Sequence, residues 1–146
     1  MRRRFAFAPA AIWALVILAL GSIPSLTPPV DLPIDKVGHF GMFFVLGALL
    51  AFGLQRAQRR PPLFLALAAG IAVGVVDELH QRAVPGRSAE LADLLADSAG
   101  VIAGVWLTHR VLARRWSIQR AAQRPHADSE AGSRTPDAGI TQEHRA

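Results

Sequence analysis

Four long apolar stretches follow one another along the chain, and a polar tail follows the last of them. The stretches cover residues 5–23, 37–54, 63–76 and 94–111. A helix needs about 20 residues to cross roughly 30 Å of hydrocarbon. The third stretch is short, but proline is tolerated in a first helical turn, so this helix can begin at Pro61. The pattern predicts four transmembrane helices at about 5–23, 37–54, 61–80 and 93–112.

Two other interpretations of these stretches are less favourable. A buried helix of a soluble bundle normally has a polar face, whereas these stretches are apolar all round. The first could be a cleaved signal peptide behind Arg2, Arg3 and Arg4. Its apolar run is longer than the usual signal, and Pro24-Ser25-Leu26 is a poor cleavage site. We therefore expect a retained helix.

The composition supports a membrane protein and excludes sites that depend on cysteine. Of the 146 residues, 51% are hydrophobic and 18% are charged, whereas soluble domains carry about 25% charged residues. The chain has no cysteine, which excludes a disulfide framework, a thiol nucleophile and a thiolate zinc site. The net charge is +5 and the pI is about 11.4, values that are also typical of nucleic-acid-binding proteins.

The position of the charges indicates an orientation and argues against nucleic-acid binding. With the N-terminus inside, the cytoplasmic segments hold eleven Lys or Arg, whereas the outer loops hold Lys36, Arg82 and Arg87. Lys and Arg stay on the cytoplasmic side of short loops. We therefore predict a multi-pass protein of the cytoplasmic membrane with both termini cytoplasmic. The basicity orients helices and contacts anionic lipid, and we expect no nucleic-acid partner.

The C-terminal tail is set apart by its composition. Residues 119–146 are rich in polar and small residues and contain few large apolar ones. Such a segment buries too little apolar surface to fold alone. We predict a transmembrane domain over residues 1–118 and a disordered polar tail over 119–146.

Acidic and histidine residues gather at the predicted outer ends of three helices. Asp35 and His39 are four residues apart on the second helix, and Asp93 and Asp97 are four apart on the fourth. The glycines and alanines that follow on the third and fourth helices allow close approach to a neighbour. We therefore expect the acidic helix ends to converge.

Some of these residues have a structural explanation. Asp35, Asp93 and Asp97 lie near helix N-termini, where a carboxylate is favoured, so capping and chemistry remain open for them. Asp77 and Glu78 lie at a C-terminal end, where the dipole disfavours negative charge. They need cations, a metal or water, and a structural ion-pair network is the alternative to a functional site.

Ionisable groups at membrane depth are functional candidates by default. The candidate catalytic residues are Asp77, Glu78, His39 and His80. The candidate substrate-binding residues are Lys36, Gln81 and Arg87, and Pro85-Gly86 forms a turn that returns Arg87 toward the carboxylates. The candidates for a structural or metal-binding role are Asp35, Asp93 and Asp97. If the enzyme uses a divalent metal ion, we expect its ligands to come from Asp35, His39, Asp77 or Glu78, and Asp93. The sequence does not identify a cofactor.

The motifs that carry these residues resemble those of VanZ-like membrane proteins. They are 35–40 (DKVGHF), 77–81 (DELHQ), 84–88 (VPGRS), Asp93 and 100–104. The resemblance covers roughly residues 10–113. Phe43 stands where the family often has Tyr, and Asp97 where it often has Asn. The resemblance implies four helices with a polar outer face. It also implies an association with low-level teicoplanin resistance in the founding member, while most members have no assigned activity.

Three classes of function follow. The first is a membrane-embedded hydrolase or transferase that acts on an envelope lipid or a cell-wall precursor at the outer leaflet. The second is a non-catalytic scaffold or partner-binding protein whose polar cluster binds a headgroup or a protein. Transport is the weakest, because the charges crowd one end instead of the midplane. We expect the lipid bilayer as the partner of such a chain, and its oligomeric state does not follow from sequence.

Overall fold

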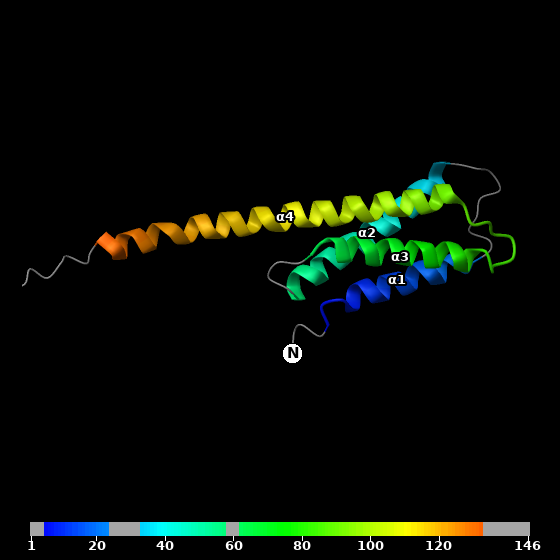
Figure 1. Cartoon of the computed structure of the whole chain (residues 1–146), viewed down its shortest axis with the longest axis horizontal. Coiled ribbons are helices and arrows are strands. Elements are labelled where there is room, and N and C mark those ends of the chain that lie inside the picture. Colours follow the sequence, from blue (N-terminus) through cyan, green and yellow to red (C-terminus); the bar gives the residue numbers. More distant parts are fainter. Residues whose placement is uncertain (1–4, 24–32, 58–61, 133–146) are drawn as a thin grey trace, which may run out of the picture. The chain divides into compact units, whose positions relative to one another are not determined.

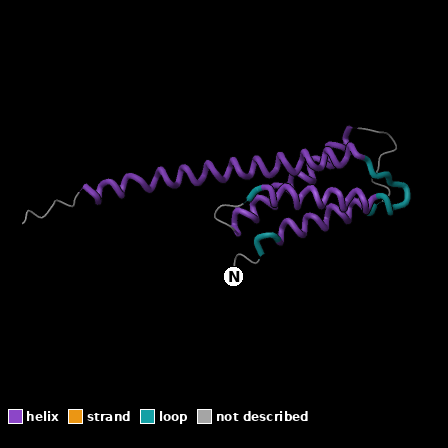
Figure 2. Tube along the Cα trace, viewed as in Figure 1, coloured by secondary structure: helices purple, strands orange, loops and turns teal. Residues whose placement is uncertain are grey.

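The computed structural model of the chain describes residues 5–23, 33–57 and 62–132, and these form four helices and no strand (Figures 1 and 2). The helices are α1 (Ala8–Gly21), α2 (Pro33–Ala57), α3 (Phe64–Gln81) and α4 (Leu91–Gly132). The predicted all-α class is confirmed. Residues 1–111 form one compact unit and residues 112–146 a second.

Three helical stretches of the described residues are long and apolar enough to cross a membrane. They are Asp35–Ala57, Phe64–Gln81 and Leu91–Gln119. Helix α1 is equally apolar but has 14 residues, which span about 21 Å at 1.5 Å per residue. A turn at residues 5–7 precedes it, so the predicted helix at 5–23 is shorter than expected. Pro9 in its first turn marks where the helix begins.

Helix boundaries differ from the predicted ones where proline or polar residues are involved. Helix α2 begins at Pro33, four residues earlier than predicted, with the proline in its first turn. Helix α3 begins at Phe64, two residues after Pro62, and Pro61, where we expected the helix to begin, lies outside the described residues.

Helix α4 continues to Gly132, although we expected it to end near residue 112. The first part of the segment predicted to be disordered is thus helical, and Ala, Arg and Gln in this stretch favour helix. Residues 133–146 lie outside the described residues.

The unit of residues 1–111 has an apolar interior that runs along the helices. Phe43 and Leu46 of α2, Ile17 of α1 and Val101 of α4 are almost completely buried. Large apolar side chains such as Leu95 and Trp106 remain more than half exposed on the outside. A surface of this kind is unfavourable in water and suits contact with lipid.

Helix α4 approaches α2 closely through glycine. A Cβ at Gly100 or Gly104 would collide with the α2 backbone at Phe40 or Phe44. In hydrocarbon, helices associate through van der Waals packing, and small residues permit this close contact. On the opposite side of α2, Trp13 Nε1 of α1 donates a hydrogen bond to the carbonyl of Met42 at 2.9 Å. The glycine contacts hold α4 close to α2, and the hydrogen bond from Trp13 joins α1 to α2.

Candidate functional site

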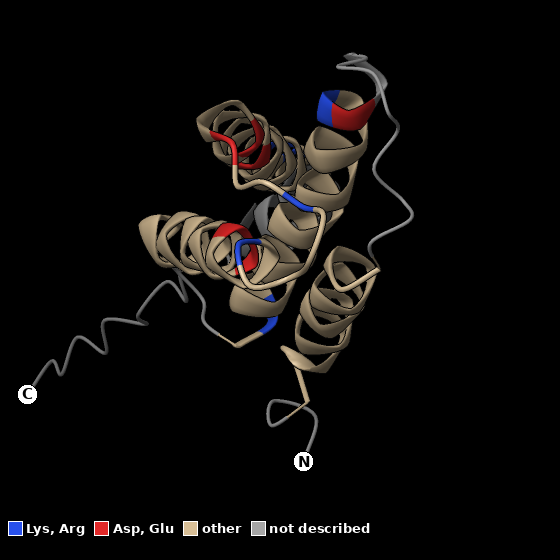
Figure 3. Cartoon of the chain, turned by 90° about the vertical axis from the view of Figure 1, so that its right-hand side faces the viewer, with Lys and Arg blue, Asp and Glu red and all other residues tan. Residues whose placement is uncertain are grey.

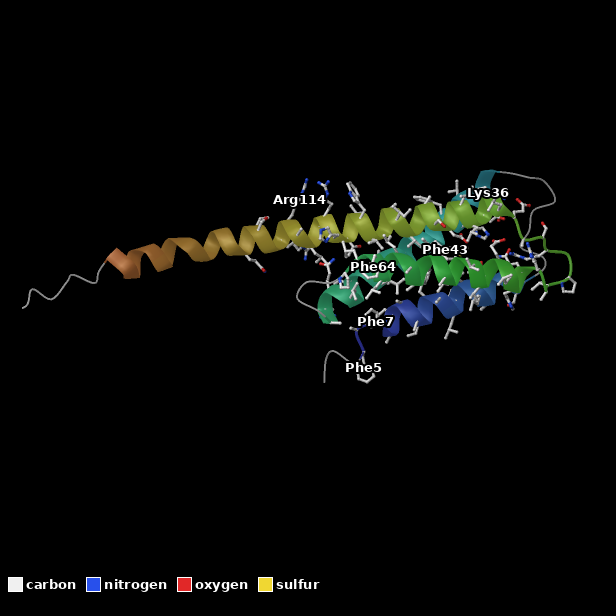
Figure 4. All side chains as sticks on the ribbon, viewed as in Figure 1. Phe5, Phe7, Lys36, Phe43, Phe64 and Arg114 are labelled. Carbon is white, nitrogen blue, oxygen red and sulfur yellow. The ribbon has the colours of Figure 1, made fainter. Side chains whose placement is uncertain are left out.

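Charged residues of three helices meet at one end of the bundle, as the sequence predicted. Figure 3 looks at this end and shows acidic segments on separate helices with basic segments beside them. In Figure 4 Lys36 lies at this end, and Phe64, at the start of α3, lies toward the other. Because consecutive helices run in opposite directions, the start of α2, the end of α3 and the start of α4 come together here. The buried polar residues are His39, Asp77, Glu78, Gln81, Asp93 and Asp97.

Four of these side chains form the inner cluster, which comprises His39, Asp77, Glu78 and Asp97. Each of them offers one possible ligand atom, and these four atoms lie within 4.8 Å of one another. His39 Nδ1 lies 2.9 Å from Asp97 Oδ1, a hydrogen bond between α2 and α4. Asp77 and Asp97 are each 1% exposed.

Neighbouring groups donate a hydrogen bond to one oxygen of each α3 carboxylate and so hold the inner cluster in place. Gln81 Nε2 donates to Asp77 Oδ2 at 2.8 Å, and the backbone N–H of Glu90 donates to Glu78 Oε2 at 2.9 Å. The remaining oxygens, Asp77 Oδ1, Glu78 Oε1 and Asp97 Oδ2, are buried and have no hydrogen-bond partner among the described residues. Burial of such oxygens without a partner is costly.

A second group of charges, the outer ion pairs, comprises Lys36, Glu90 and Asp93. Lys36 Nζ lies 2.7 Å from Glu90 Oε2 and 2.6 Å from Asp93 Oδ1. The side chains of Lys36 and Glu90 are more than a third exposed, while that of Asp93 is buried. The hydrogen bond from Lys36 lowers the pKa of Glu90. This group is an ion-pair network that ties α2 to α4, and it does not include Asp77 or Glu78, the residues for which the sequence left such a network open.

A cavity of about 190 Å³ borders the inner cluster. Its polar lining residues are Asp35, His39, Asp77, Gln81 and Arg87, and its apolar lining residues include Ile17, Leu20 and Met42. Arg87 Nε is buried without a partner among the described residues. The Pro85-Gly86 turn forms as predicted, with a φ of 81° at Gly86, and precedes Arg87. A second cavity of about 200 Å³ lies on the other side, against Glu78, Arg82 and Glu90.

The structure brings some of the site residues predicted from the sequence together and places others elsewhere. It brings His39, Asp77, Glu78 and Asp97 together and places Arg87, Gln81 and the half-buried Asp35 around the adjacent cavity. His80 is exposed and lies 2.8 Å from Ser22 Oγ, outside the inner cluster. Lys36 and Asp93 pair with each other.

Sequence reasoning did not assign Glu90 to the site. Its side chain pairs with Lys36 while its backbone N–H binds Glu78, so it joins the outer ion pairs to the inner cluster. Its spacing from Asp93 and Asp97, three and seven residues, marks one helical face and was the available signal.

An apolar helical bundle that buries carboxylates at one end defines a membrane protein with a polar site at one face. The chain belongs to the VanZ/LLP1 family, whose family model matches residues 4–113. The match covers the inner cluster, the outer ion pairs and both cavities. No curated protein and no solved structure matched the chain in the same comparisons.

Proposed function

We propose that this VanZ-like protein binds the phosphate-bearing headgroup of an envelope lipid or lipid-linked cell-wall precursor at the outer face of the bacterial cytoplasmic membrane. The observation that carries the proposal is the cavity beside the inner cluster. It is amphipathic, because Arg87 and titratable side chains line it together with apolar side chains of α1 and α2.

The charged groups of this end favour Arg87 as the phosphate-binding residue. A guanidinium forms paired hydrogen bonds with phosphate, and the buried Arg87 Nε has a donor to spare. Lys36, which we also expected to hold phosphate, is engaged by Glu90 and Asp93. The proposal therefore assigns the phosphate to Arg87.

The size of the cavity restricts the ligand. About 190 Å³ is below the usual volume of a drug-sized pocket, so it admits a headgroup and not a whole lipid. The apolar lining residues suit the first carbons of an acyl or isoprenoid chain that continues into the bilayer. Because His39 and Asp77 line the cavity, a hydrolase or transferase that acts at the phosphate is favoured over a scaffold.

Binding of short-chain lipids to detergent-purified protein tests the headgroup proposal. Dihexanoyl phosphatidic acid should bind more tightly than dihexanoylglycerol, which lacks the phosphate, as measured by native mass spectrometry. Arg87→Gln should weaken phosphatidic acid binding at least about tenfold, the effect of losing one charge-assisted hydrogen bond. Arg82→Gln is the matched control, because exposed Arg82 lies outside this cavity. Equal binding of the two lipids, or unchanged binding by Arg87→Gln, would contradict the proposal.

Turnover separates an enzyme from a binding protein. Liquid chromatography of membrane lipids incubated with the wild type should show a released phosphate-containing product that His39→Gln does not release. If the wild type binds phosphatidic acid but releases nothing from any envelope lipid fraction, the non-catalytic alternative is correct.

The orientation has its own test. A reporter fused at Pro85, in the exposed turn before Arg87, should be active on the outer side of the cytoplasmic membrane. A reporter after Ala57 of α2 should be active in the cytoplasm. A cytoplasmic Pro85 reporter would reject the outer-face site.

A further inference from the structure

The inner cluster has more negative charge than its protein neighbours neutralise. Three carboxylates and one imidazole meet in a region where Asp77, Glu78, Asp97 and His39 are all buried. Among the described residues, no Lys or Arg lies within ion-pairing distance of these three carboxylates. Three buried carboxylates are strongly unfavourable unless they take up protons or a cation.

The free oxygens provide a second, independent indication of a ligand. Asp77 Oδ1 and Asp97 Oδ2 belong to side chains that are 1% exposed, and Glu78 Oε1 is buried with them. The other oxygen of each group already has a protein partner. Each carboxylate is thus held in position by one oxygen while the second remains available.

The spacing of the four groups suits a metal ion. Ligand atoms about 2.1 Å from a common ion lie roughly 3.4 Å apart in a tetrahedral site and roughly 3.0 to 4.2 Å apart in an octahedral one. The four candidate atoms lie within 4.8 Å of one another, so small side-chain rotations bring them to that spacing. The two cavities that border the cluster provide access for an ion.

We propose that His39, Asp77, Glu78 and Asp97 bind one divalent metal cation. One nitrogen and three oxygen ligands match Mn²⁺ and Zn²⁺, since carboxylates suit Mn²⁺ and imidazole suits Zn²⁺. The cation offsets two of the three negative charges of the inner cluster and connects α2, α3 and α4. The site stands on these contacts alone and does not depend on the headgroup. If both are present, the ion lies beside the cavity that contains Arg87 and reduces the negative charge that a phosphate meets there.

Another acidic set is a weaker candidate. Asp35, His39 and Asp93 also lie within 4.8 Å of one another through one atom each. Asp93 is already neutralised by Lys36 at 2.6 Å, and Asp35 is half-buried. An ion there would compete with the lysine, so the inner cluster is the assigned site.

Equilibrium binding of Mn²⁺, followed by electron paramagnetic resonance of the free ion, tests the site in the full-length protein. Protein purified in detergent and stripped with a chelator should bind one Mn²⁺ per chain. Asp97→Asn and Glu78→Gln keep an acceptor for His39 and for the Glu90 N–H but remove one charge. Each should weaken Mn²⁺ binding at least about tenfold.

Two substitutions outside the inner cluster serve as matched controls. Glu90→Gln removes a carboxylate at the same end of the bundle, and His80→Gln removes the neighbouring imidazole. Both should bind Mn²⁺ like the wild type. Thermal unfolding of every variant with chelator present shows whether it is folded.

Three outcomes would overturn the metal site. They are no bound Mn²⁺ or Zn²⁺, equal loss of binding in the controls, and unchanged binding in folded Asp97→Asn and Glu78→Gln. In the last case the carboxyl groups of the inner cluster are neutralised by protons. None of these results depends on lipid binding, so failure of the metal site and failure of the headgroup proposal are distinguishable.

Discussion

The two acidic groups at the polar end of the bundle, the outer ion pairs and the inner cluster, differ in whether a cationic side chain pairs with their carboxylates. The outer ion pairs place Lys36 between Glu90 and Asp93, within 2.7 Å of each. The inner cluster gathers Asp77, Glu78 and Asp97 around His39 with no Lys or Arg paired to them among the described residues. Each carboxylate of the outer group has the lysine as a partner, while the carboxylates of the inner cluster have no Lys or Arg partner among the described residues. The presence or absence of a Lys partner therefore distinguishes a structural network from a candidate binding site, whereas the number of acidic residues does not.

A bulky residue at the α2–α4 crossing should have the largest effect, because both groups depend on this contact. Gly104→Leu would force the α4 backbone away from Phe44 and Ala48. We expect a loss of roughly 3 kcal/mol or more in the free energy of unfolding, as for severe overpacking. Reversible unfolding in mixed micelles measures it. Gly41→Leu is the control, because no neighbour lies within 4 Å of a Cβ at Gly41. Equal stability of the two variants would show that close approach is not required.

Removal of the lysine should break the outer ion pairs and leave the inner cluster able to bind metal. Lys36→Met leaves buried Asp93 without its cation. We expect a loss of roughly 2 to 3 kcal/mol, below the usual cost for a fully buried pair because Lys36 is partly exposed. Lys36→Arg should recover most of this loss. An unchanged unfolding free energy in Lys36→Met would mean that the pair contributes nothing to stability.

Neutralising one inner carboxylate should have opposite effects with and without metal. In chelator, Glu78→Gln should raise the unfolding temperature, because it relieves repulsion among buried carboxylates. Saturating Mn²⁺ should stabilise the variant by about 1.4 kcal/mol less than the wild type for a tenfold weaker affinity, which exceeds the gain expected in chelator. Asp93→Asn should destabilise the protein under both conditions. A Glu78→Gln effect with the same sign in both would contradict the contrast between the two groups.

The smallest expected effect is the pH dependence of the exposed ion pair. Because Lys36 lowers the pKa of Glu90 in the folded protein, the contribution of Glu90 is complete above the ordinary glutamate pKa of about 4.3. It is lost as the pH falls through the lower, folded-state pKa. The wild type should exceed Glu90→Gln by less than about 1 kcal/mol at pH 7 and by nothing at the acidic limit. A difference that persists there would assign the effect to something other than ionisation of Glu90.

The apolar pattern predicted the helices and their alternating direction, and therefore the convergence of three acidic ends. It did not determine how α3 is rotated about its axis. At about 100° per residue, Gln81 lies near the midpoint of Asp77 and Glu78, whereas His80 lies about 110° away from it. Gln81 therefore binds Asp77, and His80 is exposed beside Ser22.

The sequence also did not determine which carboxylates pair with Lys36. Several acidic residues belong to the predicted outer ends, and the pairing of Lys36 with Glu90 and Asp93 depends on the packing of α4 against α2. The same packing buries Phe43 in the apolar interior and brings Asp97 to His39. The spacing of residues in the sequence shows which of them share a helix face. Which helix faces pack together depends on how the helices cross in the folded protein.

A cation from outside the chain should sit in the inner cluster on the imidazole of His39. Pulsed electron paramagnetic resonance of Mn²⁺ bound to the full-length protein in detergent detects nitrogen coordinated to the ion. We expect a ¹⁴N modulation in the wild type and in His80→Gln that is absent in His39→Gln. A wild-type spectrum with no ¹⁴N modulation, or a modulation that survives His39→Gln, would show that His39 does not hold the ion.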